Sequence, residues 1–205
     1  MRIGIDFDNT IICYDTVFTH LAITNGLIPK NFQGTKTQVR DSIRTMPDGD
    51  TKWQHLQGKA YGVEISRAVM FDGFKAFVAH CNANNIELYI VSHKTEHGHF
   101  DETRTSLREA ARSWLRSHGI FDQNRPHILE KNVYFETTRE EKIERIKSLN
   151  CTHFIDDLIE VLDSPLFPKH IERILFQPKE DEHNDHTIQQ TYSDWNEIHH
   201  AFFSR

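Results

Sequence analysis

The N-terminal sequence MRIGIDFDNT places two carboxylates, Asp6 and Asp8, directly after an apolar run. Two more acidic side chains, Asp156 and Asp157, follow another apolar run in THFIDD. Carboxylates in an apolar setting are costly to desolvate, and several of them together repel one another strongly. A hard divalent cation bound through oxygen atoms relieves both costs. If the fold brings the four aspartates together, they therefore predict a Mg²⁺ site.

Such a site suits phosphate chemistry, because Mg²⁺ commonly binds one or two protein carboxylates together with water and phosphate oxygens. A carboxylate can attack phosphorus and form an aspartyl phosphate. We expect Asp6 to be this nucleophile, and Asp8 to protonate the leaving alkoxide and afterwards to activate water. Ser92 and Lys94, in LYIVSHK, or a lysine elsewhere, are expected to neutralise the charge on the transferring phosphoryl group.

The elements that must position these residues are short apolar runs, which alternate with segments of helical periodicity. The runs expected to be strands are Ile3–Phe7, Ile86–Val91, Val133–Phe135, Thr152–Ile155 and Arg173–Phe176. Apolar residues at helical spacing predict helices over 74–81 and 107–115. A third helix is expected to begin at Thr137 or Thr138, because each has a glutamate three residues later as a capping partner.

This alternation predicts an α/β fold, a three-layer Rossmann-like parallel sheet with helices on both faces. The carboxyl ends of parallel strands meet at one edge of such a sheet, where ligands bind. The polar residues that follow the predicted strands are therefore expected to share that edge. They are Asp6, Asp8, Ser92, Lys94, Asp156 and Asp157.

Residues 14–70 break this rhythm, because they contain helical pieces and several prolines and glycines but no convincing strand. We expect them to form a small helical insertion in a core built from residues 1–13 and 71–205. The insertion has seven basic and five acidic side chains, whereas the whole chain carries a formal charge of −6. Near the other end, the polar sequence at 179–186 is expected to be a solvated loop.

The first of these motifs resembles that of the haloacid dehalogenase (HAD) superfamily of phosphatases and phosphotransferases, and the resemblance extends over most of the chain. DFDNT is similar to the DxDxT motif that opens this family's catalytic core. The resemblance implies that Asp6 is the nucleophile, that Asp8 is the acid and base, and that Thr10 supports Asp8.

The later motifs of the family also have counterparts. Ser92 matches the phosphate-binding Ser or Thr of the second motif, and the pair at 156–157 matches the acidic fourth motif that completes the metal site. The third motif is a lysine near a helix N-terminus, upstream of the fourth. Lys142 occupies that place, and Lys94 or Lys147 could substitute for it.

The resemblance also indicates which type of reaction is favoured. Dehalogenase members lack an aspartate two residues after the nucleophile, so Asp8 favours phosphoryl transfer over carbon–halogen cleavage. An insertion after the first motif is, in this family, a mobile cap that closes over small substrates. The candidate residues for contacts with the non-reacting groups of a substrate are Arg40, Arg44, Lys52 and Lys59 in the insertion. His93, beside Ser92, is a further candidate for binding substrate or phosphate.

These expectations combine into a Mg²⁺-dependent phosphatase that acts on a small phosphorylated metabolite. A phosphotransferase or mutase that uses the same aspartyl phosphate is the alternative, and a non-catalytic module that binds a phosphorylated ligand is a second one. A polynucleotide end phosphatase is disfavoured by the net charge and the expected cap. Substrate identity and oligomeric state stay open.

Composition excludes several other classes. With a formal charge of −6 and an isoelectric point near 6.1, the chain has no basic field for nucleic acid or anionic lipid. No apolar run approaches the roughly 20 residues that cross a bilayer, and no signal peptide is expected before the first strand, so we expect a soluble, cytoplasmic protein.

Neither cysteine nor histidine suggests a zinc site. The three cysteines, Cys13, Cys81 and Cys151, are widely spaced without a CxxC pair, which argues against both a disulfide framework and a thiolate site. The histidines in SHKTEHGHFD are not at helical ligand spacing with a third partner, so we expect a loop after the second strand.

Overall fold

The computed structural model describes residues 1–100, 103–178, 188 and 190–203. The chain divides into two compact units. We call residues 1–12, 70–94 and 116–205 the sheet unit, and residues 13–69 and 95–115 the helical unit. The solvated loop expected at 179–186 lies outside the described residues.

The sheet unit contains a six-stranded parallel sheet with the strand order β5-β4-β1-β6-β7-β8. Its strands, in chain order, are β1 (Arg2–Ile5), β4 (Glu87–His93), β5 (Val133–Glu136), β6 (His153–Asp156), β7 (Glu172–Phe176) and β8 (Gln190–Tyr192). The chain runs from β1 outward through β4 and β5, then returns to the other side of β1 at β6. Ligands bind beyond the carboxyl ends of strands where the strand order reverses in this way. The ends of β1 and β6 meet at this point.

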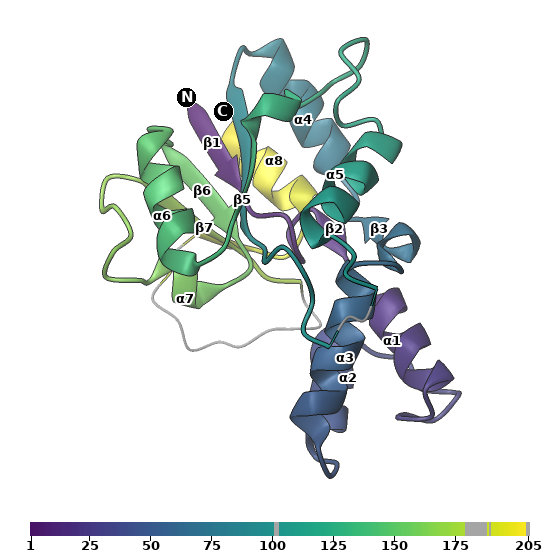
Figure 1. Ribbon diagram of the computed structural model, residues 1–205. Coiled ribbons are helices and arrows are strands. Elements are labelled where there is room, and N and C mark those ends of the chain that lie inside the picture. Colours follow the sequence, from purple (N-terminus) through teal and green to yellow (C-terminus); the bar gives the residue numbers. More distant parts are fainter. Residues whose placement is uncertain (101–102, 179–187, 189, 204–205) are drawn as a thin grey trace. The chain divides into compact units, whose positions relative to one another are not determined.

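Helices cover both faces of the sheet, which confirms the predicted three-layer fold (Figure 1). They are α4 (Phe74–Ala83) and α8 (Trp195–Phe203) on one face, and α6 (Arg139–Ser148) and α7 (Ile159–Leu162) on the other. Neighbouring residues of β7 show both layers. Leu175 belongs to a buried cluster with Ile146 of α6, whereas the ring of Phe176 packs on that of Trp195 in α8.

The central strand β1 has a glycine where its neighbour needs room. Ile3 and Ile5 are fully buried, and Gly4 lies between them. A Cβ atom at Gly4 would come within 2.5 Å of the ring of Phe154 in β6. The absence of a side chain at Gly4 therefore lets a large aromatic side chain pack over the centre of the sheet.

The helical unit is built around aromatic side chains. Its helices are α1 (Asp15–Thr24), α2 (Lys36–Arg44), α3 (Gly49–Tyr61) and most of α5 (Leu107–Ser117). The rings of Phe18 and Trp53 stack at 4.6 Å, and Tyr14 and Tyr61 pack edge to face at 4.8 Å. The unit contains nearly all of the predicted insertion and, in addition, residues 95–115.

The chain passes between the two units within β2 (Ile12–Cys13) and β3 (Val69–Met70), which form a separate two-stranded sheet, and again after Lys94 and within α5. Cys81 and Cys151 are buried free thiols, and Cys13 is half-buried. Within the part of the chain that the structure describes, no helix has the length and apolar character needed to cross a membrane.

The C-terminal helix supports the DFDNT loop through one fully buried residue. The indole N–H of Trp195 donates to the backbone carbonyl of Thr10 at 2.8 Å. We expect Trp195→Phe to destabilise the protein by about 1–3 kcal/mol, because the carbonyl loses this donor inside the protein. Thermal unfolding measures the loss, at about 2–4 °C per kcal/mol for a chain of this size. Leu166→Ala, at an exposed position, is the control, and equal stability of the two variants would contradict the role of Trp195.

Candidate active site

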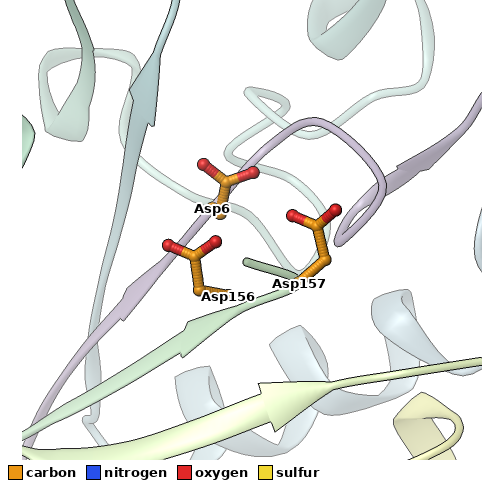
Figure 2. Close-up of side chains that lie close together, drawn as sticks. All are labelled: Asp6, Asp156 and Asp157. Carbon is orange, nitrogen blue, oxygen red and sulfur yellow. The ribbon is translucent and has the colours of Figure 1, made fainter. Parts of the chain in front are cut away.

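Three carboxylates meet at the ends of the neighbouring strands β1 and β6. Asp6 directly follows β1, Asp156 is the last residue of β6, and Asp157 comes next. The backbone N–H of Asp6 donates to the carbonyl of Ile155 at 2.8 Å, which fixes the relative position of the two strand ends. Figure 2 shows the three side chains at these strand ends. Asp6 and Asp156 are buried, and Asp157 is half-buried.

This group has the donor atoms and the spacing of a divalent-cation site. One carboxylate oxygen from each residue lies within 4.8 Å of the others. Oxygens that share one ion stand at most roughly 4 Å apart around Mg²⁺ and roughly 5 Å apart around Ca²⁺, as twice the metal–oxygen distance requires. All three donors are hard carboxylate oxygens, the type that these ions prefer. The residues present therefore fit a divalent metal ion.

A buried lysine joins two of these acids. The ammonium of Lys142 donates to Asp6 Oδ1 and to Asp156 Oδ2, each at 2.6 Å. Lys142 lies in the first turn of α6, and Thr138 caps that helix in a reciprocal capping box with Glu141. The cap fixes where α6 begins, and so which of its side chains reaches the ends of β1 and β6.

The two other lysines considered for this position lie elsewhere. Lys147 is exposed and approaches Glu144 at 3.7 Å, while Lys94 pairs with Asp8. Of the three lysines that the sequence left as alternatives, Lys142 is therefore the one that contacts Asp6 and Asp156.

Burial and the charge of the partner shift the pKa values of Asp6 and Lys142 in opposite directions. Burial raises the pKa of Asp6, the charge of Lys142 lowers it, and the charges of Asp156 and Asp8 raise it, with a net result of about 7. Burial lowers the pKa of Lys142, but Asp156 and Asp6 outweigh this and raise it above its ordinary value. Lys142 therefore stays charged at neutral pH, and additional positive charge beside Asp6 would favour its ionised form.

Asp8 lies outside the three-acid group. We expected it as a fourth acidic ligand, but its carboxylate oxygens Oδ1 and Oδ2 lie 3.0 and 2.7 Å from the ammonium of Lys94. Lys94 follows the end of β4 and is only 3% exposed. The structure thus contains two buried lysines at the same edge of the sheet, and they contact different aspartates.

Of the remaining predicted residues, Ser92 and Thr10 are buried and His93 is exposed. Ser92 lies near the end of β4, next to Phe135 in the register of the sheet. Among the described residues, no hydrogen bond reaches the hydroxyl of Thr10, so the expected support of Asp8 through that hydroxyl is not seen. The carboxylate group at 6, 156 and 157 contains no histidine, and the described residues form no other potential metal-binding cluster of three or more.

The predicted substrate contacts Arg40 and Arg44 belong to the helical unit. There the guanidinium of Arg40 pairs with Asp41 at 2.8 Å, and that of Arg44 pairs with Asp50 at 2.9 Å. Contact of either arginine with a substrate stays a prediction.

One residue that the sequence reasoning did not single out lies at the site. Asn9, between the predicted residues of DFDNT, donates from its side-chain amide to Asp157 Oδ2 at 3.3 Å. Its backbone has φ of 58°, a left-handed conformation that asparagine tolerates better than most residues. The sequence feature that could have pointed to Asn9 is its place immediately after the second aspartate, where the chain needs a tight turn.

Comparison with solved structures gives matches over the full chain. The fold is similar to a HAD family hydrolase from Deinococcus radiodurans R1 with bound phosphate and sodium (10% identity, TM-score 0.59, 99% of this chain and 95% of that one). It is also similar to Protein Tyrosine Kinase A from Mycobacterium tuberculosis (13%, 0.60, 98% and 97%). A third match is CbbY from Rhodobacter sphaeroides in complex with xylulose-1,5-bisphosphate (11%, 0.55, 96% and 95%).

Further matched structures are also described as haloacid dehalogenase-type hydrolases. No protein-family model matches the sequence, and no curated protein does. At such low identities, the likeness to solved structures shows the fold.

The Lys142 contacts predict a large and pH-dependent effect on stability. Lys142→Met leaves two buried carboxylates without their counter-charge, and we expect a loss of about 3–5 kcal/mol at pH 8. The loss should shrink at pH 5, because Asp6, whose pKa is already raised to about 7, takes up a proton and removes one of the two negative charges. Urea unfolding in EDTA measures both values.

Lys147→Met on the same helix is the matched control, since its exposed pair is worth little. A loss for Lys142→Met no greater than that of the control would show that the buried contacts do not form.

Proposed function

Because the chain has the fold of the haloacid dehalogenase superfamily, we propose that it is a Mg²⁺-dependent phosphatase that hydrolyses a small phosphorylated metabolite through an aspartyl phosphate on Asp6. The observation that supports this proposal most directly is the group around Asp6. Lys142 contacts it, Asp156 and Asp157 complete a cation site, and Asp8 lies two residues away. Nucleophile, charge neutralisation and acid–base group are thus close to one another in one unit.

In the first step, a carboxylate oxygen of Asp6 forms a bond to phosphorus while the bond to the leaving alkoxide breaks. Asp8 gives its proton to that alkoxide. In the second step, Asp8 takes a proton from water as the water oxygen bonds to phosphorus. The acyl–phosphate bond then breaks, and Asp6 is regenerated together with free phosphate.

Asp6, Asp156 and Asp157 would hold the magnesium ion. When bound, it supplies positive charge that keeps Asp6 ionised near neutral pH and neutralises phosphate oxygens. Lys142 orients Asp6 through the hydrogen bond to Oδ1. Ser92, buried near the end of β4, is assigned to the phosphate, as in the sequence-based expectation.

The substrate class is inferred from chemistry and from relatives. The Deinococcus hydrolase holds phosphate, and CbbY holds a sugar bisphosphate. We assign residues 14–70 the role of a cap on a core of residues 1–13 and 71–205, with Arg40 and Arg44 as candidate contacts to the non-reacting part of the substrate. A cap that excludes water during the first step and admits it for the second suits a small molecule.

Transfer to an acceptor other than water is the second candidate. It shares the aspartyl phosphate, and a protein described as a kinase has the same fold. Product analysis separates the two functions, because a phosphotransferase yields a phosphorylated acceptor in place of free phosphate.

Asp6→Asn tests the nucleophile. The amide is a poor nucleophile towards phosphorus, so phosphate release from p-nitrophenyl phosphate and from a panel of phosphorylated metabolites should fall on the order of 10³-fold or more. Circular dichroism checks that the variant is folded. Asp163→Asn, which removes the partner of Arg173 at the surface of the same unit, should keep its activity. Turnover by Asp6→Asn at the wild-type rate would remove Asp6 from this role.

Magnesium binding can be tested without substrate. An ion that binds only the folded state should raise the melting temperature, by the equivalent of about 2.7 kcal/mol when its concentration is 100 times its dissociation constant. We expect Asp157→Asn to lose most of this shift and Asp163→Asn to keep it. If Mg²⁺ does not change the melting temperature of the wild-type protein, that result would argue against the cation site.

A further inference from the structure

We propose that Lys94 is the positioning residue of Asp8, and that its ammonium fixes the plane of the Asp8 carboxylate from which protons are given and taken during phosphate transfer. This inference rests on the proposed function and assigns Lys94 a partner other than the phosphoryl group. It follows from the contacts of one buried ammonium.

The ammonium of Lys94 contacts both oxygens of Asp8. The distances are 3.0 Å to Oδ1 and 2.7 Å to Oδ2. The last side-chain torsion of an aspartate is broad, so a contact with a single oxygen would leave the plane of the carboxylate loosely defined. Contact with both oxygens restricts that torsion, and it therefore sets the direction in which Asp8 presents its remaining lone pairs.

Lys94 is itself held firmly enough to do this. Its backbone N–H donates to the carbonyl of Glu136 at 2.8 Å, which ties it to the end of β5. Its ammonium lies 5.5 Å from the centre of the Phe7 ring, and that ring packs edge to face on Phe135 at 6.0 Å. Phe7 stands between Asp6 and Asp8 in the chain, so the same packing fixes the backbone that carries both acids.

The burial of Lys94 also needs an explanation. Only 2% of its side chain is exposed, and an ammonium is costly to bury without an opposite charge. Asp8 provides that charge. At the neighbouring strand ends, Lys142 occupies the equivalent position for Asp6 and Asp156. The two lysines therefore serve different acids, one beside the nucleophile and the other beside the acid–base group.

The chemistry makes the direction of Asp8 important in both steps. In the first step its proton must reach the leaving oxygen as the bond from phosphorus to that oxygen breaks. In the second step the same carboxylate must accept a proton from water as water bonds to phosphorus. A displacement of about 1 Å in a reacting group can cost roughly 10²-fold in rate.

The test compares two substrates that need Asp8 to different degrees. Nitrophenolate leaves without a proton, whereas the alkoxide of glycerol phosphate requires one. We expect Lys94→Met to lower kcat/KM for glycerol phosphate about 10²-fold more than for p-nitrophenyl phosphate, with KM for glycerol phosphate little changed. A pre-steady-state burst of nitrophenolate should also appear, because a poorly placed Asp8 makes hydrolysis of the aspartyl phosphate slower than its formation. Lys147→Met is the control and should show neither effect.

A second comparison shows whether Lys94 acts through Asp8. In an Asp8→Asn background, Lys94→Met should cause little further loss, and Lys94→Arg, which keeps the charge, should recover part of the activity lost in Lys94→Met. Should Lys94→Met fail to fold, Lys94→Gln replaces it with the same expectations.

Equal losses of kcat/KM with the two substrates would indicate that Lys94 acts on the phosphoryl group, and would overturn the inference. An unchanged kcat/KM in Lys94→Met would also overturn it. So would a double variant in which the losses from Lys94→Met and Asp8→Asn multiply. These outcomes leave the proposed phosphatase intact. A wild-type protein that releases product from neither substrate, nor from the metabolite panel, would instead refute the proposed function and this inference with it.

Discussion

The contact on which the site depends most is the ammonium of Lys142 between Asp6 and Asp156. It links three elements that are far apart in the sequence, the end of β1, the end of β6 and the first turn of α6. Each charge in this contact would be costly to bury alone, and together they are tolerated only because the distances are short. The excess of negative charge that remains, with Asp157 and Asp8 nearby, is the physical reason for assigning a cation to this edge.

Much of the fold followed from the sequence because the inner strands of a parallel sheet are apolar on both faces. The inner strands β1, β4, β6 and β7 were recognisable as short apolar runs, and so was β5, an edge strand in which two of the four residues are buried. β8 was not, because its three residues, Gln190–Tyr192, are only half-buried at the edge of the sheet. The grouping of residues 95–115 with the insertion was equally hidden, since it depends on contacts such as that of the Trp114 indole with the carbonyl of Ala68.

The site was predictable where backbone topology alone decides position. Asp6, Asp156 and Asp157 follow parallel strands and therefore come together. The sequence could not choose among three lysines, because the reach of Lys142 depends on where the cap at Thr138 starts its helix. Nor could it place Asp8, whose side chain lies beyond the strand in a turn shaped by Asn9. The direction of a side chain in such a turn is set by its tertiary partners, here Lys94.

The bond from the indole of Trp195 to Thr10 has a consequence for synthesis of the protein. The residue that donates to the DFDNT loop is made 185 positions after the residue that accepts from it. Domains generally acquire their final packing as whole units during translation. The carbonyl of Thr10 therefore lacks its indole donor until synthesis has passed Trp195 and α8 can pack on the sheet.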